Sequence, residues 1–304
     1  MRRSPLRFYP AALAAALLVS AAPLLAQFSS IDYPGASATY AFGNNDLGDV
    51  VGRWEDADGV SHGFLLHRGH FTAFDPAGST FTHPADVNNL GVVVGRFIDA
   101  EGVNHGFIWT NGRFSTVDYP GSVDTRLRGI DDLGRYTGNF TLEDGHEHGF
   151  WHDRAGNHQV DYPGSDSSDV WDMTLLGGMT GDWSDVENNI YGYSLKNGTF
   201  TNLNYPGVSI TSLRGLNLQG EIVGVYETPE GDDHGVLITA SGSFVSFDFP
   251  GGFNTFGNKI NLLGHVVGYY DDADGVTHGF LWKRRAGHAK SAAPAADPDD
   301  PERD

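Results

Sequence analysis

Short apolar runs separated by polar turn residues follow one another along most of this chain. In one representative stretch they cover residues 114–119, 127–131, 135–140 and 148–152, each about as long as a β-strand. Beyond the N-terminal region, no segment keeps the 3.6-residue apolar period of an amphipathic helix. The pattern therefore predicts an all-β fold built from many short strands.

Glycine and proline mark the turns between these runs. Pro120-Gly121 ends the first run because proline cannot donate to a strand ladder, and Asp132-Leu133-Gly134 and Glu143-Asp144-Gly145 supply tight turns. The 41 glycines follow no three-residue period, so they indicate turns rather than a collagen-like chain.

Two motifs recur six times in one register. The first is Asp-Tyr-Pro-Gly or a close variant, and it begins at Asp32, Asp75, Asp118, Asp161, Asn204 and Asp248. The second is His-Gly-aromatic or a variant, and it begins at His62, His105, His148, Tyr191, His234 and His278. Successive copies of each motif lie 43, 43, 43, 43 and 44 residues apart. Since four strands in about 43 residues match one propeller blade, we predict a six-bladed β-propeller of six four-stranded repeats.

The two ends of the repeat region are complementary fragments. Residues 28–33 resemble the last strand of a repeat without its first three, and the final repeat stops after its third strand, near Trp282. Pairing 28–33 with 279–283 closes the ring and leaves no radial edge exposed. A linear solenoid needs distinct capping repeats, and the sequence shows none.

The segments that flank the repeats differ from them in composition. Three arginines precede an apolar run from Ala11 to Leu25, and the small residue Ala26 stands before a cleavage point at Gln27, as in a secretory signal peptide. The C-terminal segment is rich in alanine, proline and charge. We expect a signal peptide at 1–26, the propeller at 27–283 and a disordered tail at 284–304. This organisation predicts a secreted or periplasmic protein without membrane insertion.

The charge balance and the lack of cysteine narrow the partners. The formal net charge is −20, and it becomes −23 once the three N-terminal arginines are removed. Such an acidic surface repels phosphate backbones, so nucleic acid is not an expected partner. Without cysteine the chain has no disulfide, and its core alone must hold an exported fold. We expect a monomer that carries no cofactor.

The repeats resemble the HAF-type extracellular repeats of bacteria. The matching strings are His62-Gly-Phe-Leu-Leu, His105-Gly-Phe-Ile-Trp, His148-Gly-Phe-Trp and His278-Gly-Phe-Leu-Trp, preceded by Gly-x-Val-Val-Gly strings at 48–52, 91–95 and 264–268. This sequence departs from the family in having Gly where the name has Ala, and its fourth unit has Tyr191-Gly192-Tyr193. The resemblance implies export and a repeat fold, and it brings no catalytic chemistry.

The repeated histidines and aspartates are interpreted as architecture. A ring of equally spaced histidines suggests a metal, but equivalent third-strand positions of a propeller diverge, whereas zinc needs ligands about 2.0–2.1 Å from one ion. Each His is expected to bond a turn of its own blade, and each Asp to accept from nearby backbone N–H groups. The loop that starts at Asp56 fails as a calcium site, because its fifth and twelfth positions are Val60 and His67. No metal site is predicted.

Catalytic templates are also missing from the sequence. It has no Gly-x-Ser-x-Gly elbow, no phosphate loop and no His-Glu-x-x-His. Carboxylate pairs such as Asp232-Asp233 lie in turns that other units share. We therefore favour a non-catalytic binding or scaffold propeller over the alternative, a carbohydrate-active lyase or hydrolase. A clustered acid and base where the repeat symmetry fails would favour the enzyme.

The residues that break the repeat are the predicted ligand site. Seven residues after each motif glycine, units three to five carry Arg128, Trp171 and Arg214. The next position adds Asp172 and Lys259, and the chain just before it adds Arg126. The hypothesis is a funnel where Trp171 stacks and the arginines clamp an acidic sugar or a peptide carboxylate. The alternative is that the arginines pair with neighbouring aspartates and Trp171 packs between blades.

Overall fold

The computed structural model describes residues 27–284, and all regular structure in this range is β-strand. Antiparallel pairing divides the strands into six groups of four, called modules 1 to 6 here. Single parallel pairs join modules 1 and 2, at Ser61 and Phe81, and modules 4 and 5, at Ile190 and Ile210, into eight-stranded sheets. Module 1 comprises β2 (Ala38–Asn44), β3 (Val50–Glu55), β4 (Ser61–His67) and β5 (His70–Phe74), and module 2 comprises β6 (Phe81–Val87), β7 (Val93–Ile98), β8 (Asn104–Thr110) and β9 (Arg113–Val117). Module 3 comprises β10 (Asp124–Ile130), β11 (Tyr136–Thr141), β12 (Glu147–Asp153) and β13 (Gly156–Val160). Module 4 comprises β14 (Ser167–Met173), β15 (Met179–Ser184), β16 (Ile190–Lys196) and β17 (Thr199–Asn202).

The last two modules differ in how they are completed. Module 5 comprises β18 (Ile210–Leu216), β19 (Ile222–Glu227), β20 (Asp233–Ile238) and β21 (Phe244–Phe247). Module 6 comprises β22 (Phe253–Ile260), β23 (Val266–Asp271), β24 (Thr277–Lys283) and, from the start of the described chain, β1 (Gln27–Ile31). Phe28 lies opposite Trp282 in the β1–β24 pair, so the expected pairing of these two segments is present.

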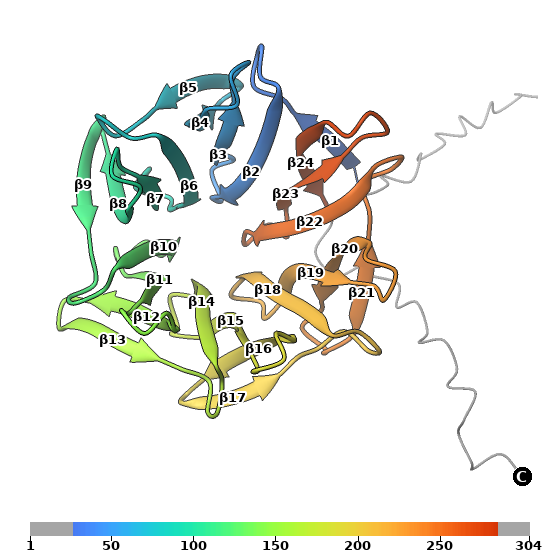
Figure 1. Cartoon of the computed structure of the whole chain (residues 1–304). Helices are drawn as coiled ribbons and strands as arrows, with labels where there is room; N and C mark the ends of the chain where they lie inside the picture. The colour runs from blue at the N-terminus through green and yellow to red at the C-terminus, as the bar shows by residue number, and fades with distance from the viewer. Residues whose placement is uncertain (1–26, 285–304) are drawn as a thin grey trace, which may run out of the picture.

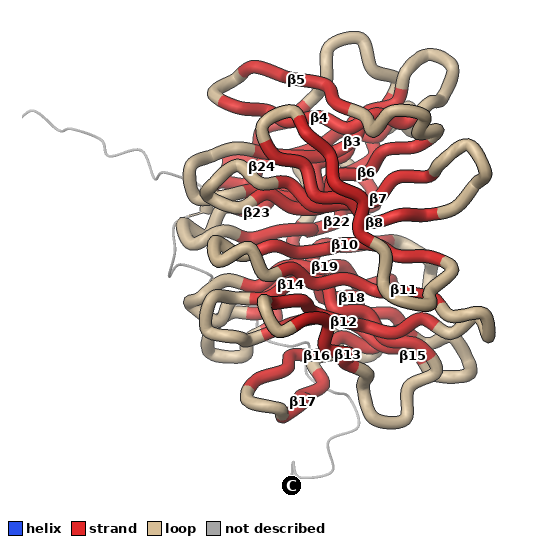
Figure 2. Tube along the Cα trace, turned by 90° about the vertical axis from the view of Figure 1, so that its left-hand side faces the viewer, coloured by secondary structure: helices blue, strands red, loops and turns tan. Residues whose placement is uncertain are grey.

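The modules are arranged around a central axis as a β-propeller (Figure 1). The first strand of each module lies innermost, and the turns project at the two ends of the axis (Figure 2). The four runs predicted between residues 114 and 152 correspond to β9, β10, β11 and β12, with their ends shifted by a few residues. Gly121, Gly134 and Gly145 all have positive φ, as their turns require.

The core lies between neighbouring modules, and the Gly-x-Val-Val-Gly strings and the His-Gly-aromatic motifs build it together. Gly52 of β3 is the cross-strand partner of Phe64 of β4, and a Cβ at Gly52 would lie 2.8 Å from the Phe64 ring. The same glycine-under-aromatic contact recurs at Gly268 and Phe280. Glycine is required there because any side chain would displace a fully buried aromatic ring.

Module 6 packs against module 1 in the same way as other neighbours. One apolar cluster joins Ile31 of β1 and Val267 of β23 to Ala41, Val50 and Phe64 of module 1. These five side chains are at most 7% exposed, so the contact is a true core.

Each inner strand contains a bulge that decides which side chains face the axis. The register shifts between Leu127 and Ile130 in β10, and equivalent shifts occur in the other five inner strands. A bulge places an extra residue in one strand and turns consecutive side chains away from strict alternation. Two consecutive positions of each inner strand therefore reach the axis. The first is the position of Arg128, and the second is occupied by Asp172 in module 4 and by Lys259 in module 6.

The last described residue is Arg284, the first residue of the predicted tail. It is only 8% exposed, and its guanidinium lies 2.5 Å from Glu221 of module 5. The pairing anchors the chain one residue past the predicted end of the propeller. The predicted signal peptide and the rest of the tail lie outside the described residues.

Candidate functional site

An aromatic and cationic hollow lies at the end of the axis where the inner strands begin. We call it the funnel. Its volume, counted out to the open mouth, is about 560 Å³, and it is lined by Tyr40, Phe42, Arg53, Phe81, His83, Arg96, Trp171, Arg214, Asn258 and Tyr269. Every inner strand except β10 supplies part of this lining, and Arg128 of β10 lines the adjoining deeper space.

The predicted trio of Arg128, Trp171 and Arg214 does converge. The Arg128 guanidinium carbon lies 3.9 Å from the Trp171 ring centroid and that of Arg214 lies 5.1 Å from it. The Trp171 indole N–H donates to Asp182 at 2.9 Å. Since the arginines come from the strands on either side of β14, Trp171 packs between modules. This part of the funnel matches the packing alternative more than a free stacking surface.

Arg126 is held by carboxylates of its own module. Its guanidinium donates to Asp124 at 3.0 Å and to Glu147 at 2.8 Å. The hydrogen bonds and charge of Asp124, acting against burial, raise the pKa of Arg126. The charge of Arg126 is therefore already neutralised, which agrees with the alternative that the arginines pair with neighbouring aspartates.

Asp172 and Lys259 lie deeper than the funnel and close the axis. The Lys259 ammonium lies 2.6 Å from both Asp172 and Asp86, and the two carboxylates are at most 1% exposed. Alternate modules carry Gly43, Gly129 and Gly215 at the same position, which leaves room for these three longer side chains. We call Asp86, Asp172 and Lys259 the axial triad. It lies between the deep end of the funnel, where Lys259 lines the same space as Arg128, Trp171 and Arg214, and a second hollow at the other end of the axis.

Two further cations of the funnel come from second strands and were missed by the sequence analysis. Arg53 of β3 stacks on Tyr40 at 3.7 Å and forms an ion pair with Glu55, and Arg96 of β7 lies 4.8 Å from the Phe81 centroid. Arg96 donates to the neutral Asn104 amide at 2.6 Å, and its buried Nε has no partner among the described residues. The signal was present in the sequence, because both arginines directly follow the last glycine of a Gly-x-Val-Val-Gly string, where other units carry Asn139 or Asp182.

Four guanidinium groups set the electrostatics of this side of the funnel. Burial, followed by the charges of Arg96, Arg53, Arg128 and Arg214, holds the pKa of His83 well below its usual value, so its ring is neutral. Burial and the neighbouring Arg128 lower the pKa of Arg96 to about 9. An anion placed here would relieve this mutual repulsion.

A cluster of carboxyl groups lies in a separate side pocket, where modules 3 and 4 meet. Asp169 of β14 and Asp182 of β15 are direct cross-strand partners, and Glu147 lines the same side pocket. Burial, opposed by Arg128 and assisted by Glu147, raises the pKa of Asp169 to about 8, and burial also raises the pKa of Asp182. Asp169 is therefore mainly protonated at neutral pH, and its buried Oδ1 has no partner among residues 27–284.

The recurrent His and Asp residues bind each other on the outside of the modules. His62 Nδ1 lies 2.8 Å from Asp75, thirteen residues on, and its Nε2 lies 3.5 Å from Asp56 in the preceding turn. His105, His148, His234 and His278 each pair in the same way with an Asp of the first motif. The expected bond to a turn is present at His62, His105 and His278, whereas the aspartates accept mainly from histidine and not from their own turns.

The fourth unit loses both members of this pair together. Tyr191 stands in place of His and Asn204, thirteen residues later, in place of Asp. The Tyr191 hydroxyl donates to Asp185 at 3.1 Å, which keeps the bond to the turn. The joint change identifies the pair as one structural unit.

Metal and membrane features were sought over the same range. Among residues 27–284, no three His, Cys, Asp or Glu side chains are grouped so as to hold a metal ion. No helix in this range is long and apolar enough to cross a bilayer.

Comparisons with known proteins establish the fold class. No family model and no curated protein matches the chain. Among solved structures, the SapL1 lectin in complex with alpha methyl fucoside superposes with a TM-score of 0.54 at 13% identity, over 81% of this chain and 92% of that one. A putative TolB from Agrobacterium tumefaciens gives 0.53 at 12% identity, over 78% and 91% of the two chains. The gluconolactonase XC5397 from Xanthomonas campestris gives 0.53 at 10% identity, over 85% and 90%. Because proteins of this fold have such different roles, the function of this chain must be inferred from the residues of its site.

Proposed function

We propose that this protein is an exported, closed six-bladed β-propeller that binds carbohydrate without catalysis, and that the funnel takes a sugar bearing a carboxylate. The observation that carries the proposal is the placement of Arg53 and Arg96 on the aromatic faces of Tyr40 and Phe81 within an open hollow. A lectin, SapL1, shares the fold.

The chemistry of this wall suits an acidic sugar in two ways. Aromatic faces bury the apolar C–H face of a sugar ring. Guanidinium groups bind carboxylates through paired, charge-assisted hydrogen bonds. Arg96 has donors to offer because its described acceptor is a neutral amide. A peptide carboxylate has the same charge but lacks the stacking ring, so it is the second choice of ligand.

A glycan array with the secreted protein tests this function. We expect hits enriched in uronic or sialic acids, and Arg96→Gln should weaken them roughly tenfold or more, as for loss of a hydrogen bond to a charged group. Arg113→Gln, an exposed position at the start of β9, is the matched control and should leave them unchanged. Equal binding of neutral and acidic sugars, or equal losses in both variants, would contradict the proposal.

The enzyme alternative keeps one specific observation in its favour. The cross-strand pair of Asp169 and Asp182 places a carboxyl group of raised pKa beside a second carboxyl group in the side pocket where modules 3 and 4 meet. A raised pKa is what a general acid needs. However, Asp182 already accepts from Trp171 and Ser212, which limits it as a base. Release of reducing ends from array hits, abolished in Asp169→Asn, would establish the enzyme; intact hits after long incubation support binding alone.

Export and monomeric state are tested separately. N-terminal sequencing of protein recovered outside the cytoplasm should begin at Gln27, and light scattering should give one chain per particle. An intact N-terminus in the cytoplasm would contradict export.

A further inference from the structure

The turns between the first and second strands of the six modules project at the end of the axis opposite the funnel mouth (Figure 2). We call this end of the molecule the hairpin end. All six turns close with the same two backbone hydrogen bonds, which in module 1 run from Asn45 to Asp49 at 3.2 Å and from Gly48 to Asn45 at 3.4 Å. Because the turns are alike and the modules repeat around one axis, their tips lie at a similar height along it.

The tips of these turns carry exposed leucines. The residue just before the turn glycine is Gln219 in module 5 and leucine in the other five modules. These tip leucines are 53–85% exposed, and they are Leu47, Leu90, Leu133, Leu176 and Leu263. Modules 4 to 6 expose a second leucine one position earlier. One exposed leucine is ordinary, but the same exposure at five equivalent tips marks a surface that contacts another body.

The exposed charges of the molecule are separated between its two ends. The turns between the third and fourth strands lie at the hairpin end, as does the end of β24. These segments carry every exposed lysine and arginine of residues 27–284, namely Arg68, Arg113, Arg154, Lys196 and Lys283. The exposed aspartates and glutamates of this range all lie at the funnel end, among them Asp58, Glu101 and Glu187. The hairpin end is therefore cationic at its surface although the whole chain has a net charge of −20.

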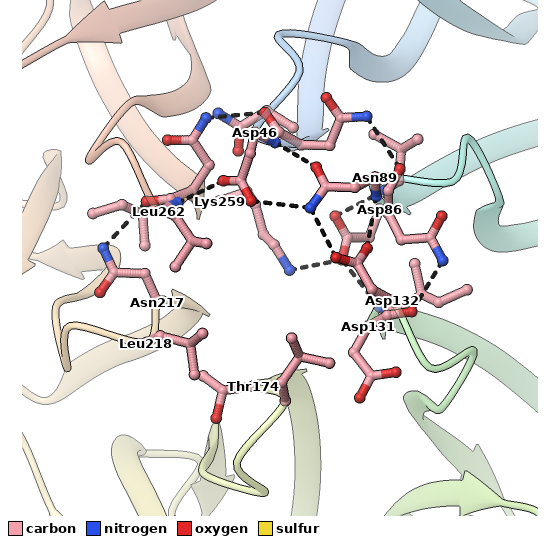
Figure 3. A pocket seen from close by; sticks show the side chains of 18 of the residues that line it. Asp46, Asp86, Asn89, Asp131, Asp132, Thr174, Asn217, Leu218, Lys259 and Leu262 are labelled. Atoms are coloured by element: carbon pink, nitrogen blue, oxygen red, sulfur yellow. Dashed lines mark hydrogen bonds and ion pairs between the residues drawn. The ribbon is translucent and has the colours of Figure 1, made fainter.

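The carboxyl groups of the hairpin end are half-buried or buried. Asp46 and Asp132 line the hollow between the turns, where the Asn89 amide donates to them at 3.0 and 2.8 Å (Figure 3). Asp153 lies 3.0 Å from the His158 ring. The side chains that project furthest at this end are therefore leucines and cations.

We propose that the hairpin end docks on the surface of a bilayer that contains anionic lipids. The tip leucines enter the headgroup region, and the exposed lysines and arginines contact lipid phosphates, without a membrane-spanning segment. Tips of similar height suit a flat surface, whereas two hairpin ends would repel each other through their cations. The funnel end also exposes apolar side chains, such as Val186 (83%) and Phe253 (60%), but its carboxylates repel anionic lipid. Docking therefore leaves the funnel mouth facing away from the membrane, and it is independent of sugar binding.

Flotation of the unmodified protein with lipid vesicles tests the partner. One set of vesicles contains phosphatidylcholine with about one-third phosphatidylglycerol, and the other contains phosphatidylcholine alone. We expect binding to the anionic vesicles to be roughly tenfold tighter or more, and to weaken as salt is added. Equal binding to the two sets, or none to either, overturns the proposal. Light scattering without lipid is the second measurement, and a dimer that needs the tip leucines would assign this surface to a second copy and also overturn it.

Variants at the two ends then locate the docking surface. Leu90→Ser combined with Leu176→Ser should weaken vesicle binding about tenfold or more, because two buried leucines are lost from the contact. Lys196→Gln should weaken it about fivefold. Val186→Ser and Glu187→Gln make matched changes at the funnel end and should leave binding unchanged.

Two results would contradict this location. Full binding by the double leucine variant would show that charge alone attracts the vesicles. A gain in Glu187→Gln as large as the loss in Lys196→Gln would show that net charge, rather than one end of the molecule, controls binding. All four changes are at exposed positions, and equal melting temperatures confirm that each variant is folded.

Discussion

His278 Nδ1 lies 2.6 Å from Asp32 Oδ1, although 246 residues separate them in the chain. The pair joins β24 of module 6 to the residue that follows β1, and it repeats the His–Asp contact that four other modules make within one stretch of chain. His278 also contacts Asp272 in the preceding turn, at 3.1 Å. The recurrent motifs therefore help to hold the first and last segments together.

Stability should fall as the pH rises above neutrality. Burial alone would lower the pKa of His62, His105 and His278, but their hydrogen bonds to aspartates outweigh it and raise the pKa. A raised histidine pKa contributes stability that is fully present below about pH 6.5 and is lost as the pH rises through the folded-state value. We expect a lower melting temperature at pH 9 than at pH 6, measured at constant ionic strength. His278→Gln should reduce this difference, and a flat profile in the unmodified protein would contradict the prediction.

Asp169 should add to the same trend. Its folded-state pKa of about 8 is above the ordinary value of 3.8, so its protonation stabilises the fold at low pH and this contribution disappears between those two values. Asp169→Asn mimics the neutral acid, so the variant should exceed the unmodified protein in stability by more at pH 9 than at pH 5. Urea unfolding at both pH values measures this difference. A variant less stable than the unmodified protein at pH 9 would show that the fold favours the ionised carboxylate, contrary to a raised pKa.

Lys259→Met should destabilise the protein strongly. It leaves the carboxylates of Asp86 and Asp172 buried without their shared cation, and removing one partner of a buried ion pair costs about 3–5 kcal/mol. Lys283→Met, at an exposed position at the end of β24, is the control and should change the free energy of unfolding by less than about 0.5 kcal/mol. Comparable midpoints in urea for the two variants would argue against a structural role for the axial triad.

Gly43→Ala should destabilise through overpacking at the axis. A Cβ at this position would lie 2.5 Å from the Asp86 Cα and 2.8 Å from the Ala85 carbonyl oxygen, both backbone atoms that cannot move aside cheaply. We expect a loss of about 1–3 kcal/mol in the free energy of unfolding. Gly178→Ala meets only the Thr174 hydroxyl, at 3.3 Å, and should be tolerated. Equal stability of the two variants in thermal unfolding would rule out the steric argument.

Part of the candidate site followed from the repeat and part did not. Register equivalence identified Arg128, Trp171 and Arg214 as neighbours, and the structure brings them together. Asp172 and Lys259 meet at the axis in the triad, because the bulge in each inner strand directs that position toward the axis, and Lys259 lines the same deep space as the three predicted neighbours. Arg53 and Arg96 were missed because attention to first strands ignored their cross-strand partners, Tyr40 and His83.

The sequence by itself determined the strands, their turns and the six-fold register, since apolar runs, glycine turns and motif spacing are local properties of the chain. It also distinguished the architectural His and Asp residues from those that vary. Only the tertiary structure decided which varying side chains meet, because the axis brings together residues 87 or 173 positions apart, as in the contacts of Lys259 with Asp172 and Asp86. Their charges, burial and unpaired atoms depend on that convergence.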